Sequence, residues 1–578
     1  MNRCILLALG AIVAMPLWAA VYYAAPDGDD SAEKNSEETP WTLQKCETSA
    51  RNADEIRLLK GRYLLEKALT PWVNVTVRGW NADRDEVILD GQGKVRCVYV
   101  QQTYYTDIHL ENLTIANGYS SGTTAADSGA GVYVTSDGFT MTNCIVTCCT
   151  NVNKEGGAVY GLKNRQQFVD CLFSKNFAKG GGAIKGYADV IANCTFAGNH
   201  SAATGQAGGG ALNMSGAVAY SDCVFSNNTT LAYAADIYAA GAARMTNCRF
   251  YNSHSISASA AIYEANAALV LNDCYFTNCV SDINTVAYGG AISLSNGCLA
   301  MTNSTFVGCA GCAGGVASVL RSSPADVHRA SLVAKGCTFR GNSATGTFPS
   351  TCRGGVFFVE GASTAEIDGC VFCENFSTNH NAVLWNKANS AYACESFVIR
   401  NCLFDGNKSA SGLAANATAY SAIQTSTGNF LVQNCTFVNN TSSGTYPAMN
   451  VYNAGAEGIV RNCLMYRNLS AKGSQYDDVN GINDLQRNLY TNCFIYSGAV
   501  TVNGCFGKDL DPKFVDEAKA DYRLEKGSPC VNAGFNEPWM IGARDLQNVK
   551  KVRRIEQDIV DVGCYEYRPT PGLQLILR

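Results

Sequence analysis

The sequence has little charge, little proline and little histidine. Charged residues make up 16% of the 578 residues, against roughly a quarter in a typical soluble domain, and there are 12 prolines and 5 histidines. The net charge of −5 gives no electrostatic basis for a nucleic-acid partner. An aromatic content of 10% excludes global disorder. Beyond residue 20 no apolar run reaches the roughly 18 residues of a membrane helix, so no transmembrane segment is predicted in the mature chain.

The shortage of charge is confined to the middle of the chain. Of the 93 charged residues, 28 lie in residues 1–111, 24 in residues 506–578 and only 41 in the 394 residues between. The middle is rich instead in Gly, Ala, Ser, Thr, Asn and Cys. The composition therefore divides the chain into three regions.

The first 20 residues have the pattern of a secretory signal peptide. Arg3 precedes an apolar core from residue 5 to residue 17, and Ala19 and Ala20 provide small residues for cleavage. An uncleaved anchor is the alternative. We expect an exported protein that is secreted or associated with the cell surface or outer membrane. Cleavage would remove Cys4 and leave 26 of the 27 cysteines.

A short repeat fills the middle of the chain. Its core is Asn or Asp, then Cys, any residue and Phe, often with Asn three residues after the Phe, and direct Cys-to-Cys steps run from 23 to 33 residues. Gly-Ala followed by an aliphatic residue recurs between the copies, as at Gly182-Ala183-Ile184. Amphipathic helical stretches are absent, which excludes helical repeats. The pattern predicts a parallel β-helix with three short strands in each coil.

Strand alternation places the Cys and the Phe of each copy on the same side, which must be the core. The Cys side chains of successive coils would then stack about 4.8 Å apart. Asn before Cys and after Phe should lie at corners, where its side chain can bond the backbone and left-handed φ is tolerated. The predicted core ladder consists of Cys144, Cys171, Cys194, Cys223, Cys248, Cys274, Cys337, Cys370, Cys402, Cys435, Cys463 and Cys493.

The pairing of Gly-Gly-Ala-Ile with Phe-x-x-Asn resembles the repeats of the polymorphic outer membrane proteins. That resemblance implies an all-β fold, a right-handed parallel β-helix of the pectin-lyase type. Residues 22–44 are similar to the start of secreted bacterial β-helix proteins, which implies a helical cap around residues 41–53. The last region, with Gly527-Ser528-Pro529-Cys530 and Asp561-Val562-Gly563-Cys564, resembles the choice-of-anchor Q domain. We therefore expect a signal peptide at 1–20, a cap and first coils at 21–111, repeats at 112–504, a small domain at 505–568 and a tail at 569–578.

The cysteines allow two interpretations. An exported chain with an even number of mature cysteines can carry a disulfide framework, or the ladder cysteines can be small buried apolar residues. Ser304 replaces a ladder Cys without breaking the repeat, which favours the second. Cysteines outside the ladder are better disulfide candidates, and no metal site is expected, since Cys309-x-x-Cys312 has no second pair at zinc spacing. These candidates are Cys148, Cys149, Cys309, Cys312, Cys352 and Cys373.

Enzymes are known on this fold, so catalysis has to be considered. The galacturonan-hydrolase motifs and the Arg-x-Pro-x-x-Arg pattern of a pectate lyase group are absent from the sequence. Asp170, Asp222 and Asp273 take the Asn position before the ladder Cys, where they could form an acidic ladder or simply cap the corner. The sequence favours a non-enzyme without a cofactor. The alternative is a polysaccharide lyase or glycosidase on a uronate-rich or other extracellular polysaccharide, with calcium if it is a lyase.

A binding face is the leading functional prediction. The residue after Gly-Ala-aliphatic should point outward, and in successive coils it is often Tyr, whose flat face and hydroxyl suit sugar rings. Tyr also suits exposed strands without any ligand. We expect a secreted or cell-surface scaffold, adhesin-like, that binds an extracellular polysaccharide or a surface partner; a self-assembling envelope component is a third possibility. The predicted carbohydrate-binding residues are Tyr133, Tyr160, Lys185, Tyr238 and Tyr263.

Overall fold

The computed structural model describes most of the chain. The described residues are 19–100, 107–161, 163, 165–204, 208–256, 259–282, 289–321, 330–345, 352–361, 364–378, 381–387, 396–410, 422–425, 430–443, 448–451, 458–470, 490–497, 503–547 and 553–568. The predicted signal peptide, apart from its last two residues, and the predicted tail at 569–578 lie outside them.

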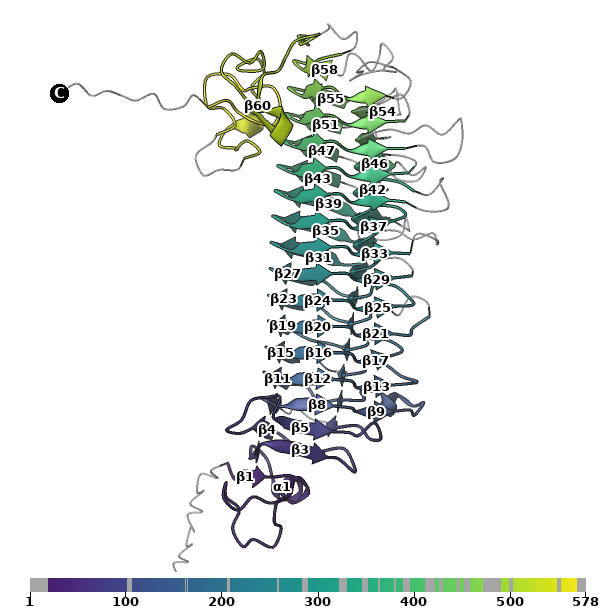
Figure 1. The fold of residues 1–578 in the computed structure, drawn as a ribbon, viewed down its shortest axis with the longest axis vertical. Coiled ribbons are helices and arrows are strands. Elements are labelled where there is room, and N and C mark those ends of the chain that lie inside the picture. The colour runs from purple at the N-terminus through teal and green to yellow at the C-terminus, as the bar shows by residue number, and fades with distance from the viewer. Residues whose placement is uncertain are drawn as a thin grey trace, which may run out of the picture.

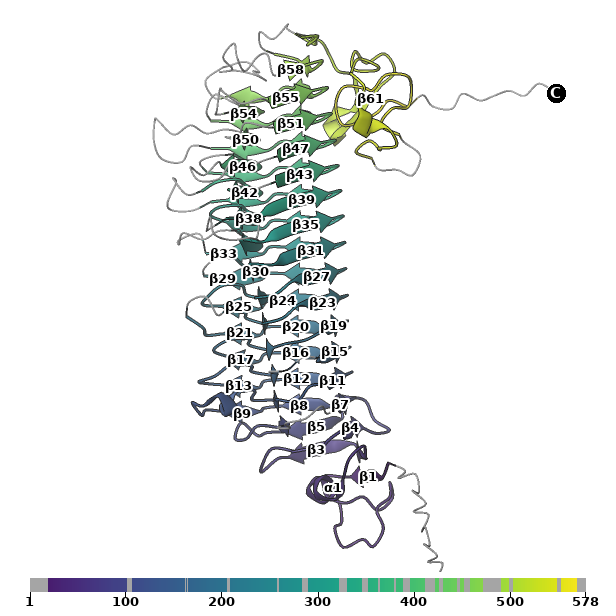
Figure 2. The same ribbon diagram turned by 180° about the vertical axis from the view of Figure 1, so that it is seen from behind.

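The predicted parallel β-helix is confirmed, and it stands as a long column of stacked coils (Figure 1; Figure 2 from behind). Most coils contribute one strand to each of four parallel sheets, which we name A to D. A strand pairs in register with the equivalent strand one coil further on, as Thr140 does with Gln167. The prediction of three strands in each coil was therefore wrong. The fourth strand, in sheet D, is only two residues long, too short to be seen as a strand in the sequence.

Within the described residues, sheet A has 17 strands and sheet B has 16. Sheet A comprises β1 (Val21–Ala24), β2 (Glu55–Leu58), β4 (Thr76–Gly79), β7 (Ile108–Glu111), β11 (Phe139–Thr142), β15 (Gln167–Val169), β19 (Val190–Ala192), β23 (Val218–Ser221), β27 (Ala243–Thr246), β31 (Ala268–Asn272), β35 (Cys298–Thr302), β39 (Ser331–Lys335), β43 (Thr364–Asp368), β47 (Ser396–Arg400), β51 (Phe430–Gln433), β55 (Gly458–Arg461) and β58 (Tyr490–Thr491). Sheet B comprises β3 (Gly61–Leu64), β5 (Val87–Asp90), β8 (Thr114–Ala116), β12 (Ile145–Thr147), β16 (Leu172–Ser174), β20 (Thr195–Ala197), β24 (Val224–Ser226), β28 (Arg249–Tyr251), β32 (Tyr275–Thr277), β36 (Thr305–Val307), β40 (Thr338–Arg340), β44 (Val371–Cys373), β48 (Leu403–Asp405), β52 (Thr436–Val438), β56 (Leu464–Tyr466) and β59 (Phe494–Ile495).

Sheets C and D have 13 strands each in the same described part of the chain. Sheet C comprises β6 (Val98–Val100), β10 (Val132–Val134), β14 (Val159–Gly161), β18 (Ile184–Gly186), β22 (Leu212–Met214), β26 (Ile237–Ala239), β30 (Ile262–Ala265), β34 (Ile292–Ser295), β38 (Ala317–Leu320), β42 (Phe357–Glu360), β46 (Leu384–Lys387), β50 (Ile423–Thr425) and β54 (Met449–Val451). Sheet D comprises β9 (Tyr119–Ser120), β13 (Thr150–Asn151), β17 (Phe177–Ala178), β21 (His200–Ser201), β25 (Thr229–Thr230), β29 (His254–Ser255), β33 (Val280–Ser281), β37 (Ala310–Gly311), β41 (Ser343–Ala344), β45 (Phe376–Ser377), β49 (Lys408–Ser409), β53 (Thr441–Ser442) and β57 (Leu469–Ser470).

The interior is lined by the repeat residues. The phenylalanines of the repeat form a stack along sheet B, with neighbouring ring centroids 4.4–5.3 Å apart and interplanar angles of 3–11°. The ladder cysteines are buried, at most 2% exposed, and are present as free thiols. The stacked rings are Phe173, Phe196, Phe225, Phe250, Phe276, Phe306, Phe339, Phe372, Phe404 and Phe437.

The corner between sheets A and B is built around the ladder cysteine. The residue before it adopts left-handed backbone, as at Asn193 with φ 49°. The backbone N–H of Cys337 donates to Cys370 Sγ at 3.4 Å, and that of Cys370 donates to Cys402 Sγ at 3.5 Å. Cys370 Sγ in turn donates to the carbonyl oxygen of Asp368 at 3.4 Å. The ladder thiol is thus a hydrogen-bonding group that satisfies a buried corner N–H, and not only a small apolar residue.

The corner after sheet B carries a second ladder, made of asparagines. Asn199 Oδ1 accepts the backbone N–H of Asn176 at 3.1 Å, and Asn199 Nδ2 donates to the carbonyl oxygen of Phe173 at 3.0 Å. Left-handed backbone occurs at the residue before this asparagine, for example at Lys175 with φ 55°. The left-handed residue at this corner is thus the one before the asparagine and not the asparagine itself. The buried members of this ladder are Asn176, Asn199, Asn228, Asn342, Asn375, Asn407, Asn440 and Asn468.

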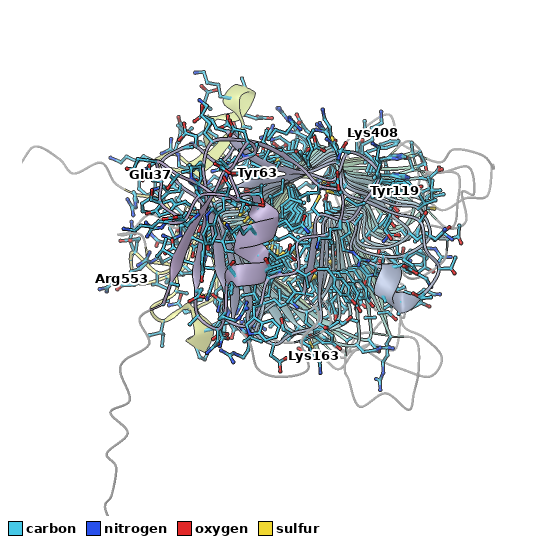
Figure 3. The ribbon with its side chains drawn as sticks, turned by 90° about the horizontal axis from the view of Figure 1, so that it is seen from below. Glu37, Tyr63, Tyr119, Lys163, Lys408 and Arg553 are labelled. Atoms are coloured by element: carbon cyan, nitrogen blue, oxygen red, sulfur yellow. The ribbon has the colours of Figure 1, made fainter. Side chains whose placement is uncertain are left out.

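The two ends of the column differ from its middle. Helix α1 (Leu43–Ser49), N-capped by Thr42, packs against β1 and β2 and lies across the N-terminal end of the coils (Figure 3). Residues 503–568 carry the antiparallel pair β60 (Phe514–Asp516) and β61 (Asp521–Leu524), with the short helices η2 (Glu517–Lys519) and η3 (Pro538–Met540). This C-terminal region packs on the outer face of the last strands of sheet B.

Candidate functional site

The five predicted binding residues lie in one column on the outer side of sheet C. Strand register aligns Tyr133 with Tyr160, Tyr160 with Lys185, and Tyr238 with Tyr263. Their strand neighbours, such as Val132, belong to the main hydrophobic core, so the column faces away from it. Within the described residues the column, in coil order, is Tyr99, Tyr133, Tyr160, Lys185, Asn213, Tyr238, Tyr263, Ser293, Ser318, Phe358, Trp385 and Gln424.

The N-terminal end of this column is covered. Tyr133 and Tyr160 are only 5% and 7% exposed, and their ring centroids lie 5.7 Å apart at an interplanar angle of 14°. Burial raises the pKa of both phenols. Arg96 lies over the rings of Tyr99 and Tyr133, 5.1 Å from each centroid, and donates to the carbonyl oxygen of Gly129 at 2.8 Å. These rings stack on one another beneath the 126–129 segment, so their faces offer little surface to a sugar.

The middle of the column is more open. Tyr238 and Tyr263 are partly exposed, with ring centroids 5.4 Å apart and nearly parallel planes. Tyr233, from the turn before β26, places its ring 4.8 Å from that of Tyr263. One coil away from Tyr238, Asn213 accepts a hydrogen bond from Lys185 Nζ at 2.9 Å, and burial lowers the pKa of that lysine. We name Tyr233, Tyr238 and Tyr263 the tyrosine cluster.

The C-terminal end of the column changes character. Ser318 Oγ donates to Ser293 Oγ at 3.2 Å, and both residues are buried. Phe358 and Trp385 then pack edge to face at 5.7 Å, with Arg353 4.3 Å from the Trp385 ring centroid. Sequence reasoning missed Tyr99, Tyr233 and these two rings. The Val98-Tyr99-Val100 triplet repeats Val132-Tyr133-Val134 and could have extended the column, whereas Tyr233 lies outside the repeat register.

A polar cleft separates sheet A from the C-terminal region. Its cavity of about 270 Å³ is lined on one side by successive coils and on the other by residues 543–546. Asn401 Nδ2 donates to Asp368 Oδ1 at 3.0 Å, and Asp545 accepts the backbone N–H of Glu566 at 3.2 Å. Burial raises the pKa of both Asp368 and Asp545. Lys335 also lines the cleft and pairs with Glu366 at 3.0 Å.

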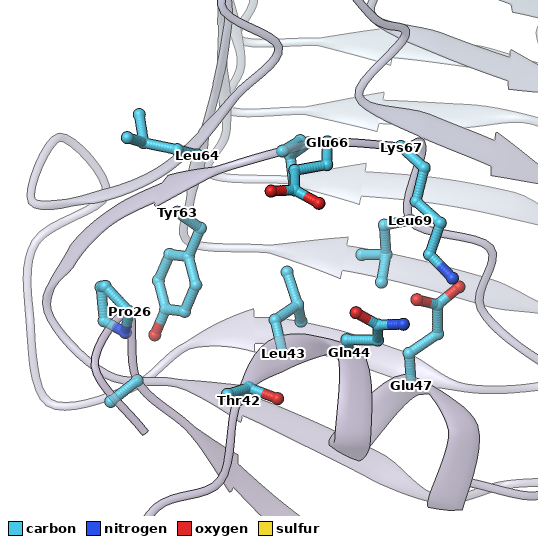
Figure 4. A pocket seen from close by; sticks show the side chains of 12 residues that line it. Pro26, Thr42, Leu43, Gln44, Glu47, Tyr63, Leu64, Glu66, Lys67 and Leu69 are labelled. Atoms are coloured by element: carbon cyan, nitrogen blue, oxygen red, sulfur yellow. The ribbon is translucent and has the colours of Figure 1, made fainter. Parts of the chain in front are cut away.

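A second cavity, of about 510 Å³, lies between α1 and the first coil (Figure 4). Leu43 and Leu69 point into it, and Glu47 and Lys67 lie at one end. Tyr63 at the opposite end donates its hydroxyl to the carbonyl oxygens of Ala24 and Leu59. The tyrosine hydroxyl is thus used in holding the cap, so this cavity belongs to the junction of the N-terminal helix with the coils.

The aspartates before the ladder cysteines serve the corners. Asp170 and Asp222 adopt left-handed backbone, with φ near 55°. Asn193 Nδ2, one coil on, donates to Asp170 Oδ1 at 2.6 Å, and Asn247 Nδ2 donates to Asp222 Oδ1 at 2.7 Å. The alternation of Asp with Asn thus pairs an acceptor with a donor, which fits corner capping.

The comparisons with known proteins agree with the fold. A family model described as the Chlamydia polymorphic membrane protein repeat matches residues 170–187. This segment holds the Asp170-Cys171-Leu172-Phe173 and Gly182-Ala183-Ile184 motifs, and the predicted resemblance to a β-helix of the polymorphic outer membrane protein kind is confirmed. No curated protein is similar enough in sequence to match the chain.

Several solved structures of low sequence identity are similar to this chain. They include the catalytic unit of the GH87 alpha-1,3-glucanase from Streptomyces thermodiastaticus, at 12% identity and TM-score 0.32 over 78% of this chain and 70% of that one. A mannuronic acid specific polysaccharide family 6 lyase from human gut microbiota is 11% identical, with a TM-score of 0.33 over 75% of this chain and 91% of that one. The pectate lyase Pel9A is 12% identical, with a TM-score of 0.22 over 95% of this chain and 96% of that one. Likeness at this level concerns the β-helix alone.

Among the residues that the structure describes, no helix combines the length and the apolar character needed to cross a bilayer.

Proposed function

We propose that this chain is an exported, surface-associated β-helical scaffold that binds a glycan through the tyrosine cluster on sheet C, without catalysis. The repeat of the polymorphic membrane protein kind at residues 170–187 supports the coarser part, a surface β-helix. The observation that carries the finer part is the partly exposed, stacked pair of Tyr238 and Tyr263 with Tyr233 beside it. Aromatic rings held in this way give a rigid apolar platform with hydroxyl groups at its edge.

Polar groups beside the cluster complete the chemistry for a sugar. Lys185 lies in the column two coils before Tyr238, and Asn213 one coil before it. Lys185 Nζ, which donates to Asn213 Oδ1 at 2.9 Å, can also donate to a hydroxyl or carboxylate oxygen of a sugar. The lysine favours a glycan that carries acidic groups. Extracellular polysaccharides rich in uronates have this chemistry.

Binding can be measured on a glycan array, followed by titration calorimetry with the strongest glycan. Tyr238→Ala and Tyr263→Ala should each weaken binding about threefold to tenfold, the effect of one lost aromatic contact. Tyr275→Ala is the matched control, because Tyr275 is an exposed strand tyrosine on the outer face of sheet B. Equal affinities of the wild type and both cluster variants would disprove the tyrosine cluster as the site.

The cleft at the C-terminal region favours the alternative, a polysaccharide lyase or glycosidase. Its carboxyl groups of Asp368 and Asp545 have raised pKa values, and carboxyl groups in a cleft are the usual acid and base of glycosidases. Incubation with polyuronides, with and without calcium, would reveal this activity as unsaturated products or new reducing ends. Activity that Asp368→Asn or Asp545→Asn abolishes would replace the binding proposal with an enzyme.

A further inference from the structure

Two cysteines outside both ladders face each other across neighbouring coils. Cys312 Sγ and Cys352 Sγ lie 3.7 Å apart, and the residues are 1% and 0% exposed. The backbone N–H of Arg353 donates to the carbonyl oxygen of Cys312 at 3.1 Å, and Ala313 and Arg353 form a parallel bridge. The two backbones therefore run side by side at the usual strand separation of about 4.8 Å, inside the 4.4–6.8 Å range of Cα distances across disulfides.

The ladder thiols lie at a similar separation but are used differently. Cys370 Sγ accepts the N–H of Cys337 and donates to the carbonyl oxygen of Asp368. Oxidation of a ladder pair would remove the thiol donors and disturb both hydrogen bonds. Ser304 in the ladder keeps this pattern with a hydroxyl that cannot be oxidised to a disulfide. The ladders are therefore built for thiols.

The other disulfide candidates outside the Cys-x-Phe ladder are placed less favourably. Cys149 and Cys309 occupy positions of the asparagine ladder, where each backbone N–H donates to an Asn Oδ1 of the next coil. Cys148 is exposed at the corner of the same coil. Cys373 lies on the outer side of sheet B. Cys309 also faces Cys279 of the preceding coil, but this pair lies within the asparagine ladder, whereas Cys312 and Cys352 lie outside both ladders.

We infer that Cys312 and Cys352 form a disulfide in the exported protein. The two thiols lose two protons and two electrons to a disulfide oxidant, through a mixed disulfide, and the oxidant leaves as two thiols. The sulfurs, 3.7 Å apart, approach to the S–S bonding distance of about 2.0 Å by rotation about χ1. This inference rests on the proposed export, because disulfides persist in oxidising compartments. Both sulfurs are buried in the folded chain, so the bond forms during folding.

The bond would close one coil of the β-helix. Strands β38 to β41 lie between the two cysteines, and the cross-link ties the start of this segment to the start of the next coil. Arg353, directly after Cys352, lies over the rings of Trp385 and Phe358. The disulfide would therefore hold Arg353 in place beside Phe358 and Trp385. Here the coils are joined by the isolated bridge between Ala313 and Arg353.

Peptide mapping of the full chain tests this inference. The protein is refolded in a buffer of oxidised and reduced glutathione, denatured with N-ethylmaleimide but no reductant, digested and analysed by mass spectrometry. The expected result is a linked pair of peptides, two hydrogen masses below their sum, that contains Cys312 and Cys352, with maleimide on the ladder cysteines. Maleimide on both Cys312 and Cys352 would overturn the inference.

Thermal unfolding gives a second readout. Reductant should lower the Tm of the wild type and leave the Tm of the Cys312→Ser/Cys352→Ser variant unchanged, because only the wild type has the bond to lose. Cys148→Ser is the matched control and should keep both the linked peptides and the response to reductant. An equal response of the wild type and the double variant would also overturn the inference, and the peptide map decides alone if the variant does not fold. Because neither readout involves a glycan, failure of the disulfide is distinguishable from failure of the binding proposal.

Discussion

The hydroxyl of Ser304 accepts the backbone N–H of Cys274 at 3.1 Å and donates to the carbonyl oxygen of Thr302 at 3.0 Å. In the following coils the thiol of Cys370 makes the same two kinds of bond. Serine therefore replaces cysteine in the ladder because it keeps a donor and an acceptor at the same corner. The ladder position thus uses hydrogen bonding as well as small side-chain size.

This relationship predicts which of two substitutions at Cys370 costs more free energy of unfolding. Cys370→Ser should cost little stability, because a hydroxyl can still accept the N–H of Cys337. Cys370→Ala should cost about 1–3 kcal/mol, because that N–H is left buried without a partner. Urea unfolding of the three proteins measures the difference. Equal losses in the two variants, or a smaller loss in Cys370→Ala, would show that the ladder is only apolar volume.

Substitution in the asparagine ladder should cost more stability than substitution in the cysteine ladder. Asn375 is fully buried; its Oδ1 accepts the backbone N–H of Asn342 at 3.0 Å, and its Nδ2 donates to the carbonyl oxygen of Phe339 at 3.1 Å. Asn375→Ala removes both bonds and should cost about 2–5 kcal/mol, measured by urea unfolding. The control is Asn252→Gly, at an exposed corner with φ 54° that glycine adopts easily. A loss in the control as large as in Asn375→Ala would refute a special role for the ladder.

Much of this architecture could be predicted from the repeat. The Cys-x-Phe spacing identifies the inward positions, because alternation in a strand is fixed by backbone geometry. The two-residue strands of sheet D could not be predicted, since Phe177–Ala178 carries no alternation to detect. The repeat also does not indicate that the corner backbone turns left-handed at Lys175 and not at the asparagine after it.

The candidate site was less predictable than the fold. Tyr160 and Tyr238 occupy equivalent strand positions, yet the first is 7% exposed and the second partly exposed. The repeat does not encode this difference, because it sets the strand positions and not the segments that connect the coils. Nor does it encode the proximity of Cys312 and Cys352, because that depends on the register of two coils that 40 residues separate. Repeats determine what lies inside the column, whereas the connecting segments determine what its outer face exposes.

Two buried carboxyl groups predict a dependence of stability on pH. Burial raises the pKa of Asp236 from 3.8 to about 7, and that of Glu264 from 4.5 to about 7. The side chains of Asn228 and Ser253 donate to the Asp236 carboxyl. The folded chain thus keeps protons that the unfolded chain releases, and the resulting stability is complete below about pH 4 and is lost as the pH rises towards 7. For Asp236 the loss is about 4 kcal/mol.

Neutral variants at these positions should flatten the profile. Asp236→Asn keeps an acceptor for Asn228 and a donor for Ser253 but no longer titrates. Glu264→Gln likewise replaces the second carboxyl group with an amide that does not ionise. Urea midpoints at pH 5, 6, 7 and 8 and constant ionic strength measure the slope. Each variant should decline less than the wild type, and the double variant least. Parallel profiles of all four proteins would show that these groups ionise alike in the folded and unfolded states.

The attachment of the C-terminal region rests on a change in the outer face of sheet B. Leu464, 1% exposed, packs there in a cluster with Tyr522 and Val562, whereas Thr305 in an earlier coil holds the equivalent outward position and is partly exposed. Leu464→Asp buries an unpaired charge against this region and should release it, since such a charge costs several kcal/mol. Limited proteolysis should then cut near residues 497–510 much faster than in the wild type, while Thr305→Asp should leave the rate unchanged. Equal cleavage rates in all three proteins would mean that polar contacts hold the region without the apolar cluster. One such contact is the hydrogen bond from the Tyr522 hydroxyl to Asp405 Oδ1 at 2.9 Å.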